Sequence, residues 1–416
     1  MFIARREKYL KYLDHESISL FFSGVAPQRS QDDNYPFSVN RNFFYLTGID
    51  QENVCLLMVK SLDKTESFIF IEAIDPIKSL WTGAGFSFED AANISGVSLN
   101  NVKDIKELDT FVSQMLSTSR RAVFGELKTA YLDLDRLNPE LLDTKAQFYA
   151  KYLLSLFPYL QIKPNQAFLA TLRTIKDSAE VEAIKKSISI TKDGIKRLMK
   201  TMKPKETEYE MEAEFNYVLN KNKAIPAFGT IAASGKNATV LHYRNNDTVI
   251  KDGELVLFDL GADLDHYSAD ITRTIPSNGK FSDRQKAIYE VVLKTNKDTI
   301  EWLKPGVTLQ AFNEYGRKIL IEGAKSLGLI KNDNEIIKYY YHSLGHYLGL
   351  DIHDVGKYSE PIPVGAIITV EPGLYIAEEG IGIRIEDDIL VTKDGCINLS
   401  KDIIKEVSEI EAFMKK

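Results

Sequence analysis

The sequence predicts two domains, an α/β domain followed by an α+β domain. Its 416 residues correspond to two or three domains of ordinary size. In roughly the first 160 residues, short β-rich runs alternate with helical patterns, which is typical of an α/β domain with a mixed sheet. The rest of the chain opens with long helical patterns and ends in short strands. Two prolines in FPYLQIKPN mark the boundary, so we expect domains 1–165 and 166–416.

The elements of the first domain follow from runs of β-branched and aromatic residues between helical periodicities. We expect strands at 18–22, 54–59, 67–72 and, more weakly, 122–124, and helices at 105–115 and 146–156.

In the second domain, Asp177 can cap a helix that runs to residue 202, with Glu180 near its third position as a partial capping box. Further helices are expected at 206–220, 282–303 and 309–327. Strands 256–259 and 268–274 read as a hairpin, and later strands are expected at 367–370, 374–377 and 384–391.

Composition and charge exclude several classes of protein. A net charge of −7 argues against non-specific nucleic-acid binding, which needs clustered Lys and Arg. Cys55 and Cys396 belong to no CxxC or Cys/His pattern, which predicts two reduced thiols rather than a long-range disulfide or a zinc site. No signal segment and no uncharged apolar run of ~18 residues is visible, so we expect a cytoplasmic protein that binds no membrane.

Histidine is concentrated in one short segment. Three of the six histidines, His342, His346 and His353, lie within HSLGHYLGLDIH. Imidazole is the commonest neutral metal ligand and the usual acid or base near pH 7, so the cluster indicates a site. Three unrelated histidines at a polar turn remain an alternative. A helical HExxH zinc motif is excluded, because Ser343 stands where the glutamate would be.

Four carboxylates lie in or beside strands that are suited to burial: Asp259, Asp270, Glu371 and Glu386. Each alone could face solvent at a strand end, but buried carboxylates need a partner or a metal. Two divalent cations would balance four such charges, and a bridging hydroxide would leave the site near neutral. Ligands that are mostly oxygen with one imidazole favour Mn²⁺ or a similar ion. Two metals about 3.5–4 Å apart make hydroxide available at neutral pH.

Five segments in this order carry a family resemblance: LHY at 241–243, FDLGADLDHYSADITRT at 258–274, HSLGHYLGLDIHD at 342–354, EPGLYI at 371–376 and IGIRIEDDILVT at 381–392. The set resembles the metallopeptidases that comprise aminopeptidase P, prolidase and methionine aminopeptidase, whose catalytic domain has the pita-bread fold. YPFSVNRNFFYLTGI at 35–49 resembles the N-terminal domain of aminopeptidase P, of the creatinase and prolidase type. The resemblance covers nearly the whole chain and is greatest to Xaa-Pro aminopeptidase.

This resemblance implies two bound divalent ions. Mn²⁺ is the expected metal, with Co²⁺ or Zn²⁺ as alternatives. Their ligands would be Asp259, Asp270, His346, Glu371 and Glu386, with Asp270 and Glu386 bridging both ions. Substrate and the tetrahedral intermediate would be contacted by His242, His342 and His353, while His15 and His266 would be surface residues.

The implied reaction releases the N-terminal residue from peptides with proline in second position. A hydroxide bridging the ions would attack the scissile carbonyl, and His353 would help stabilise the oxyanion. Glu371 would pass the proton of the attacking water to the leaving nitrogen, assisted by His242. Arg384 would pair with a carboxylate or contact substrate, which the family position favours. Tyr375 would hydrogen-bond near the site or simply pack.

Prolidase, which cleaves Xaa-Pro dipeptides with the same ligands, is the main alternative. Residues 35–49 and the IGIRIEDD strand favour aminopeptidase P over it. Creatinase works without the metals, methionine aminopeptidase usually lacks so large an N-terminal domain, and non-catalytic relatives typically lose ligands. The family also implies a homodimer or homotetramer, with the first domain serving oligomerisation and active-site access. Trp81 would either pack or reach the active site of a neighbouring subunit.

Overall fold

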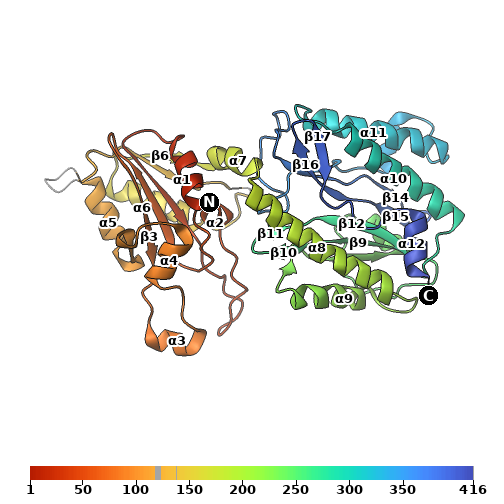
Figure 1. Ribbon diagram of the computed structural model, residues 1–416, viewed down its shortest axis with the longest axis horizontal. Coiled ribbons are helices and arrows are strands. Elements are labelled where there is room, and N and C mark those ends of the chain that lie inside the picture. The colour runs from red at the N-terminus through yellow and green to blue at the C-terminus, as the bar shows by residue number, and fades with distance from the viewer. Residues whose placement is uncertain (118–122, 137, 416) are drawn as a thin grey trace. The chain divides into compact units, whose positions relative to one another are not determined.

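The computed structural model describes residues 1–117, 123–136 and 138–415. The chain separates into two compact units, Met1–Leu172 and Arg173–Lys416 (Figure 1). Helix α7, Gln166–Thr174, contains the division between them.

The first unit is built on a mixed sheet of six strands in the order β4-β3-β2-β1-β5-β6, which confirms the predicted α/β class. Strands β1 to β3 pair antiparallel, whereas β4, β5 and β6 join their neighbours in parallel. The strands are β1 (Ser17–Phe22), β2 (Cys55–Lys60), β3 (Thr65–Ile71), β4 (Val102–Asp104), β5 (Thr129–Leu132) and β6 (Gln161–Pro164). The helices before α7 are α1 (Phe2–Leu10), α2 (Arg41–Thr47), α3 (Pro76–Thr82), α4 (Phe88–Ser95), α5 (Leu108–Leu116) and α6 (Lys145–Leu156).

The strand expected at 122–124 is not observed where it was predicted. Ala122 lies outside the described residues, and Val123 and Phe124 form a bend. Phe124 nevertheless packs into the core of the unit, so its apolar character reflects burial from a loop rather than a strand. The strand of this region is β5, a few residues later.

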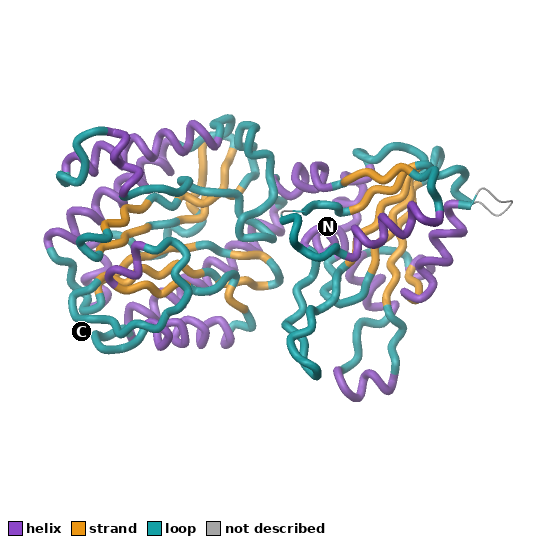
Figure 2. Tube along the Cα trace, turned by 180° about the vertical axis from the view of Figure 1, so that it is seen from behind, coloured by secondary structure: helices purple, strands orange, loops and turns teal. Residues whose placement is uncertain are grey.

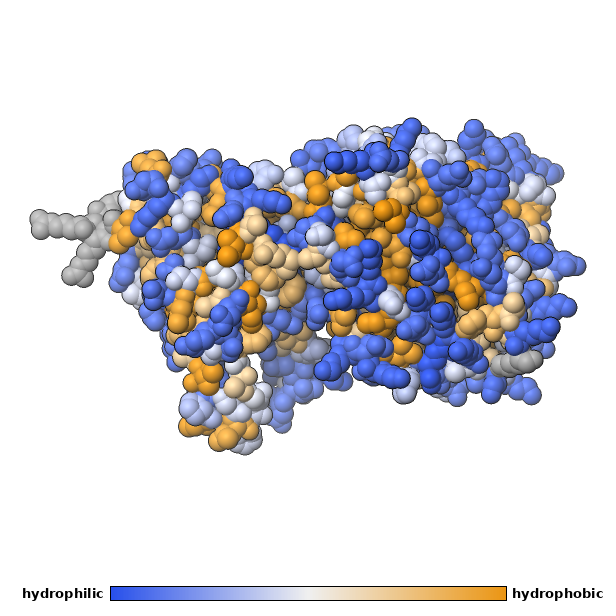
Figure 3. All heavy atoms as spheres, viewed as in Figure 1, coloured by the Kyte–Doolittle hydropathy of each residue, from blue (hydrophilic) through white to orange (hydrophobic). Residues whose placement is uncertain are grey.

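Helix α3 carries apolar side chains that face away from its own unit. Ile77 is 71% exposed, and Leu80 and Trp81 are each 86% exposed. No residue of α3 is buried, and Figure 3 shows hydrophobic side chains on the part that protrudes at this helix. Ordinary packing, one of the two interpretations of Trp81, is therefore wrong.

The second unit repeats one arrangement twice, a pair of helices followed by a three-stranded antiparallel sheet. This α+β architecture was predicted, although the sequence shows no repeat. The first half consists of α8 (Ser178–Thr201), α9 (Glu208–Lys221), β8 (Ile231–Ser234), β9 (Leu255–Leu260) and β12 (Ile271–Pro276). The second half consists of α10 (Asp283–Trp302), α11 (Leu309–Ser326), β13 (Ile367–Val370), β16 (Asp387–Thr392) and β17 (Gly395–Asn398). Figure 2 shows the strands between the two helix pairs.

Shorter elements complete this unit: β7 (Ile225–Pro226), β10 (Ala262–Leu264), β11 (Tyr267–Ser268), β14 (Gly373–Ile376), β15 (Ile381–Arg384) and α12 (Val407–Met414). The capping box of Asp177 and Glu180 forms as predicted. β9 and β12 pair as the predicted hairpin, but β10 and β11 form a smaller hairpin between them. The single strand expected at 384–391 is wrong, because Ile385 and Glu386 interrupt it between β15 and β16.

Both cysteines are free thiols, as expected. Among the described residues, no helix is both long and apolar enough to span a membrane.

Candidate active site

Two of the predicted carboxylates face each other across an interrupted β-ribbon. β13 pairs with β16 so that Val370 lies opposite Asp387, and the β14–β15 hairpin continues in the same register. Glu371 lies between β13 and β14 along the chain, and Glu386 lies between β15 and β16, so the two glutamates are opposite each other. These four strands form the interrupted ribbon. Pro372, which has no N–H group, occupies the position after Glu371 and cannot donate to a ladder.

The other two carboxylates come from the β9–β12 hairpin. Asp259 lies near the end of β9, opposite Thr272, and Asp270 directly precedes β12. The backbone approaches closely here, because a Cβ atom on Gly261 would lie 1.8 Å from a carbonyl oxygen just before Asp270. The Oγ1 hydroxyl of Thr272 donates to Glu386 Oε2 at 2.6 Å and so links the two ribbons.

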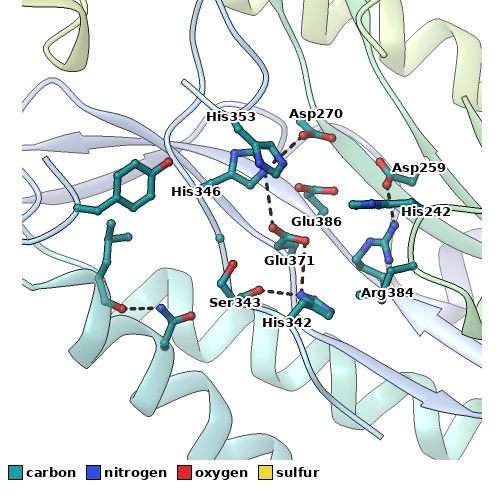
Figure 4. A pocket seen from close by; sticks show the side chains of 15 residues that line it. His242, Asp259, Asp270, His342, Ser343, His346, His353, Glu371, Arg384 and Glu386 are labelled. Atoms are coloured by element: carbon teal, nitrogen blue, oxygen red, sulfur yellow. Dashed lines mark hydrogen bonds and ion pairs between the residues drawn. The ribbon is translucent and has the colours of Figure 1, made fainter. Parts of the chain in front are cut away.

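His346 completes this cluster (Figure 4). Its Nε2 atom lies 3.5 Å from Asp270 Oδ2 and 3.7 Å from Glu371 Oε1. Its Nδ1 atom lies 3.0 Å from the carbonyl oxygen of Tyr347, which can only accept, so Nδ1 carries the hydrogen. The Nε2 lone pair therefore faces carboxylate oxygens, an arrangement that is favourable only with a cation or a proton between them. Ligand atoms of Asp270, His346 and Glu386 all lie within 4.8 Å of one another.

The electrostatics of these groups also fit a cation. Burial raises the pKa of Asp270 and of Glu386 well above its usual range, and neighbouring carboxylates add to the rise. Burial raises the pKa of Glu371 to about 8, against the effect of the Arg384 guanidinium and with a further rise from Asp259. Asp259 Oδ1 is buried and has no hydrogen-bond partner among the described residues. Oxygen-rich donors with one neutral imidazole suit Mn²⁺-like divalent ions.

Arg384 begins a hydrogen-bonded chain that leads to the histidine segment. Its Nη2 lies 2.6 Å from Asp259 Oδ2, and its Nη1 donates to the Tyr375 hydroxyl at 2.9 Å. That hydroxyl donates to His342 Nε2 at 2.8 Å, and His342 Nδ1 donates to the Ser343 carbonyl at 2.7 Å. Arg384 thus pairs with a carboxylate, and Tyr375 hydrogen-bonds at the site. Burial lowers the pKa of His342 to about 3, so its ring is neutral at pH 7.

All nine predicted site residues line one cavity of about 540 Å³. His242 and His353 are exposed at its edge, and the His353 ring lies 4.0 Å, centroid to centroid, from that of His346. Burial lowers the pKa of His346 to about 4 and also lowers that of His353. His15 is exposed as expected, whereas His266 is half-buried in the turn between β10 and β11.

Two residues at the site, Thr272 and Asn313, escaped the sequence analysis. Thr272 could have been found, because it follows Asp270 by two positions and therefore shares its face of the strand. Asn313 on α11 lines the cavity and accepts a hydrogen bond from the backbone N–H of Leu344 at 2.5 Å. It lies in an ordinary helical pattern far from the histidines, so no local signal marks it.

The chain is similar to known proteins over nearly its full length. Residues 182–393 match the model of metallopeptidase family M24, and residues 2–124 match the aminopeptidase P N-terminal domain. The chain is 34% identical to an Xaa-Pro aminopeptidase of Haemophilus influenzae, over 99% of this chain and 96% of the relative. A Bacillus anthracis structure assigned as an aminopeptidase P has a TM-score of 0.96 and 47% identity, covering 100% of this chain and 97% of that one.

Structures of Escherichia coli aminopeptidase P are also similar, both with the inhibitor Pro-Leu and, after zinc substitution, with product. Each has a TM-score of 0.89 and 30% identity, covering 99% of this chain and 97% of that one. The fold is therefore an aminopeptidase P N-terminal domain joined to a pita-bread catalytic domain. The chain belongs to metallopeptidase family M24, in its aminopeptidase P group.

Proposed function

We propose that this protein is a metal-dependent Xaa-Pro aminopeptidase, which releases the first residue of peptides that have proline in second position. The observation that carries this proposal is the cluster of four carboxylates around the His346 imidazole. The cluster lies in a chain that aligns with an Xaa-Pro aminopeptidase over nearly its full length.

We assign two divalent ions to the cluster, with Mn²⁺ preferred and Co²⁺ or Zn²⁺ as alternatives. Their ligands would be Asp259, Asp270, His346, Glu371 and Glu386, of which Asp270 and Glu386 would serve both ions. The unpartnered Asp259 Oδ1 and the lone pair of His346 support this assignment. When bound, such ions polarise the scissile carbonyl and make water nucleophilic at neutral pH.

The chain's own residues would then move protons and hold the substrate. Glu371 would take a proton from the attacking water and give it to the leaving nitrogen. That nitrogen belongs to proline and must gain a proton to leave. His242 and His353 at the cavity edge would contact the peptide, and His353 would face the oxyanion. His342 has both ring nitrogens engaged, so it would contact substrate through the face of its ring.

The aminopeptidase is favoured over prolidase by the inhibitor of the Escherichia coli relative. Pro-Leu is the dipeptide that remains when the first residue leaves an Xaa-Pro-Leu peptide. A prolidase would instead release free proline from a dipeptide.

The test is mass spectrometry of an Ala-Pro-Leu tripeptide and an Ala-Pro dipeptide after incubation with enzyme and Mn²⁺ or EDTA. We expect alanine and Pro-Leu from the tripeptide, with no cleavage in EDTA. Cleavage of the dipeptide alone would make the protein a prolidase. Glu371→Gln should abolish turnover, whereas Glu360→Gln, at an exposed glutamate that pairs with Lys357, should not.

We further propose that the first unit serves oligomerisation and active-site access, with a homodimer or homotetramer as the working form. The exposed Ile77, Leu80 and Trp81 of α3 support a contact with another copy of the chain. Sedimentation should show a mass above that of one chain, and Leu80→Asp should lower it. A wild-type protein that sediments as a monomer would contradict this proposal.

A further inference from the structure

We infer that Asn296 is a positioning residue that sets the separation of Glu371 and Glu386. This inference rests on the metal site proposed above. Asn296 lies on α10 and is completely buried. Its Nδ2 amide donates to two backbone carbonyls, that of Val370 at 3.0 Å and that of Ile385 at 3.4 Å. Each of these residues immediately precedes one of the two glutamates, so one side chain holds both positions.

The interrupted ribbon explains why the Ile385 carbonyl needs an outside donor. Ile385 lies opposite Pro372, and its N–H donates to the Pro372 carbonyl at 3.2 Å. The return bond of an antiparallel pair cannot form, because proline has no N–H. Asn296 supplies the missing donor. The same amide group also donates to Val370 at the end of β13. The two interruptions of the ribbon, one after Val370 and one at Ile385, are therefore both hydrogen-bonded to Asn296 on α10.

Lys405 fixes the orientation of the Asn296 amide. Its Nζ lies 2.8 Å from Asn296 Oδ1, and an ammonium group can only donate. The amide oxygen must therefore face Lys405, which turns the NH₂ group toward the two carbonyls. Lys405 is itself held by Asp387, whose other oxygen lies 2.7 Å from Arg273 Nη2.

Arg273 extends this support to the strand that carries Glu386. It is fully buried, and its Nη1 donates to the carbonyl oxygens of Glu386 at 2.5 Å and Thr272 at 2.9 Å. Thr272 in turn donates through its hydroxyl to the Glu386 carboxylate. Arg273 and Thr272 thus hold the backbone and the side chain of Glu386, and Asn296 also reaches the strand of Glu371.

The substitution Asn296→Asp tests this inference because it preserves shape and removes both donors, although it also adds a negative charge. The new carboxylate can keep Lys405 but places an oxygen against two carbonyl oxygens. Asn246→Asp is a control that adds the same charge: Asn246 is 2% exposed and donates to the Thr230 carbonyl at 2.8 Å and to Glu212 Oε2 at 2.9 Å, and neither residue is a proposed ligand. In both variants a buried amide keeps an acceptor role and loses its bond to a backbone carbonyl.

The measurement is calorimetric titration of EDTA-treated, dialysed full-length protein with Mn²⁺, together with the melting temperature of the metal-free form. We expect Asn296→Asp to weaken Mn²⁺ binding about 10- to 100-fold, the usual effect of losing a group that orients a ligand. Asn246→Asp should lower the melting temperature comparably and leave Mn²⁺ affinity within about twofold of wild type.

Equal Mn²⁺ affinities in Asn296→Asp and wild type would overturn the inference while leaving the proposed function intact. A wild type that binds no Mn²⁺ would overturn both. If Asn296→Asp does not fold, Lys405→Met replaces it, since it leaves the amide present but free to turn. We then expect a several-fold loss of Mn²⁺ affinity, and an unchanged affinity would overturn the inference.

Discussion

Two buried ion clusters in the second unit have the same composition and different surroundings. In each, one aspartate lies between an arginine and a lysine, and that aspartate directly follows a residue of the site. The Asp354 cluster consists of Asp354, Arg173 and Lys176, and the Asp387 cluster consists of Asp387, Arg273 and Lys405. Asp354 follows His353 at the edge of the cavity, whereas Asp387 follows Glu386 in its floor.

The difference lies in what else each cluster touches. In the Asp354 cluster, Arg173 also pairs at 2.6 Å with Asp351, whose side chain is 42% exposed. Its aspartate N–H donates to the Tyr347 carbonyl at 2.8 Å and closes the loop that carries His353. In the Asp387 cluster, Arg273 instead donates hydrogen bonds to the backbone carbonyls of Thr272 and Glu386. The same three residue types therefore close a loop in one place and bind backbone carbonyls beside the interrupted ribbon in the other.

The carboxylates of the two clusters and those of the cavity have pKa values shifted in opposite directions. Burial alone would raise the pKa of Asp354 and of Asp387, but in each case the lysine and arginine hold it below its usual range. The equally buried Glu386 has a raised pKa, although Arg384 acts in the opposite direction. Asp354 and Asp387 thus each pair with a lysine and an arginine, whereas Asp270 and Glu386 at the cavity form no ion pair with either residue type in the described part of the chain.

The largest effect is expected from Asp387→Asn. It would leave Arg273 and Lys405 buried without their carboxylate, which typically costs about 3–5 kcal/mol in the free energy of unfolding. Urea denaturation of the metal-free protein measures this loss. Because the same change loosens the strand of Glu386, Mn²⁺ affinity should also fall. A loss below about 1 kcal/mol would show that the cluster is dispensable.

Asp354→Asn should destabilise less, because Arg173 keeps Asp351. The free energy of unfolding of Asp354→Asn should exceed that of Asp387→Asn by at least about 1.5 kcal/mol, which is the contribution of a hydrogen bond to a charged group. Here kcat/KM should fall, since the His353 loop is released, while Mn²⁺ affinity stays within about twofold of wild type. Weakened Mn²⁺ binding in this variant would erase the functional distinction between the clusters.

The pH dependence of stability tests whether the buried carboxylates at the cavity lack cationic partners in the metal-free protein. Glu371 has an ordinary pKa of 4.5 when unfolded and about 8 when folded and metal-free, so between these values only the folded state holds the proton. Raising the pH from 6 to 8 therefore favours unfolding, by about 2 kcal/mol at ~1.4 kcal/mol per pH unit. Mn²⁺ needs the deprotonated carboxylate, so its stabilising effect should grow over the same range.

Calorimetric melting with EDTA and with Mn²⁺ at pH 6 and pH 8 measures both effects. Glu371→Gln is the control, and its metal-free form should show a smaller fall in stability between the two pH values. An equal Mn²⁺-induced shift at both pH values in the wild type would contradict this account.

The smallest effect is expected at the surface pair of Arg284 and Glu379. Its shortest contact is 2.6 Å, the same as that between Arg173 and Asp354, but its side chains are 39% and 30% exposed. Glu379→Gln should cost only about 0.2–1 kcal/mol in urea denaturation, because solvent screens the pair. A loss as large as that of Asp354→Asn would mean that distance, not burial, controls these interactions.

The parts of the molecule that the sequence predicted are those with a local signal. The strand expected at 367–370 is β13, and Asp259 and Glu371 were recognisable as carboxylates at the ends of apolar runs. The break at Ile385 was missed because IGIRIEDDILV alternates like one strand. Its cause, Pro372, lies on the opposite strand. Asn296 was missed for a related reason, since its carbonyl partners lie 74 and 89 residues away and no periodicity connects them.

The unchanged pairing register on both sides of the ribbon's break has a consequence for how this protein can vary. The turn between β14 and β15 lies beyond both glutamates, so residues added at this tip would leave their alignment intact. One residue inserted between Glu371 and β14 would instead shift the pairing and turn side chains to the opposite face. Length variation among natural sequences or engineered insertions should therefore be tolerated at 377–380 and excluded at the two breaks.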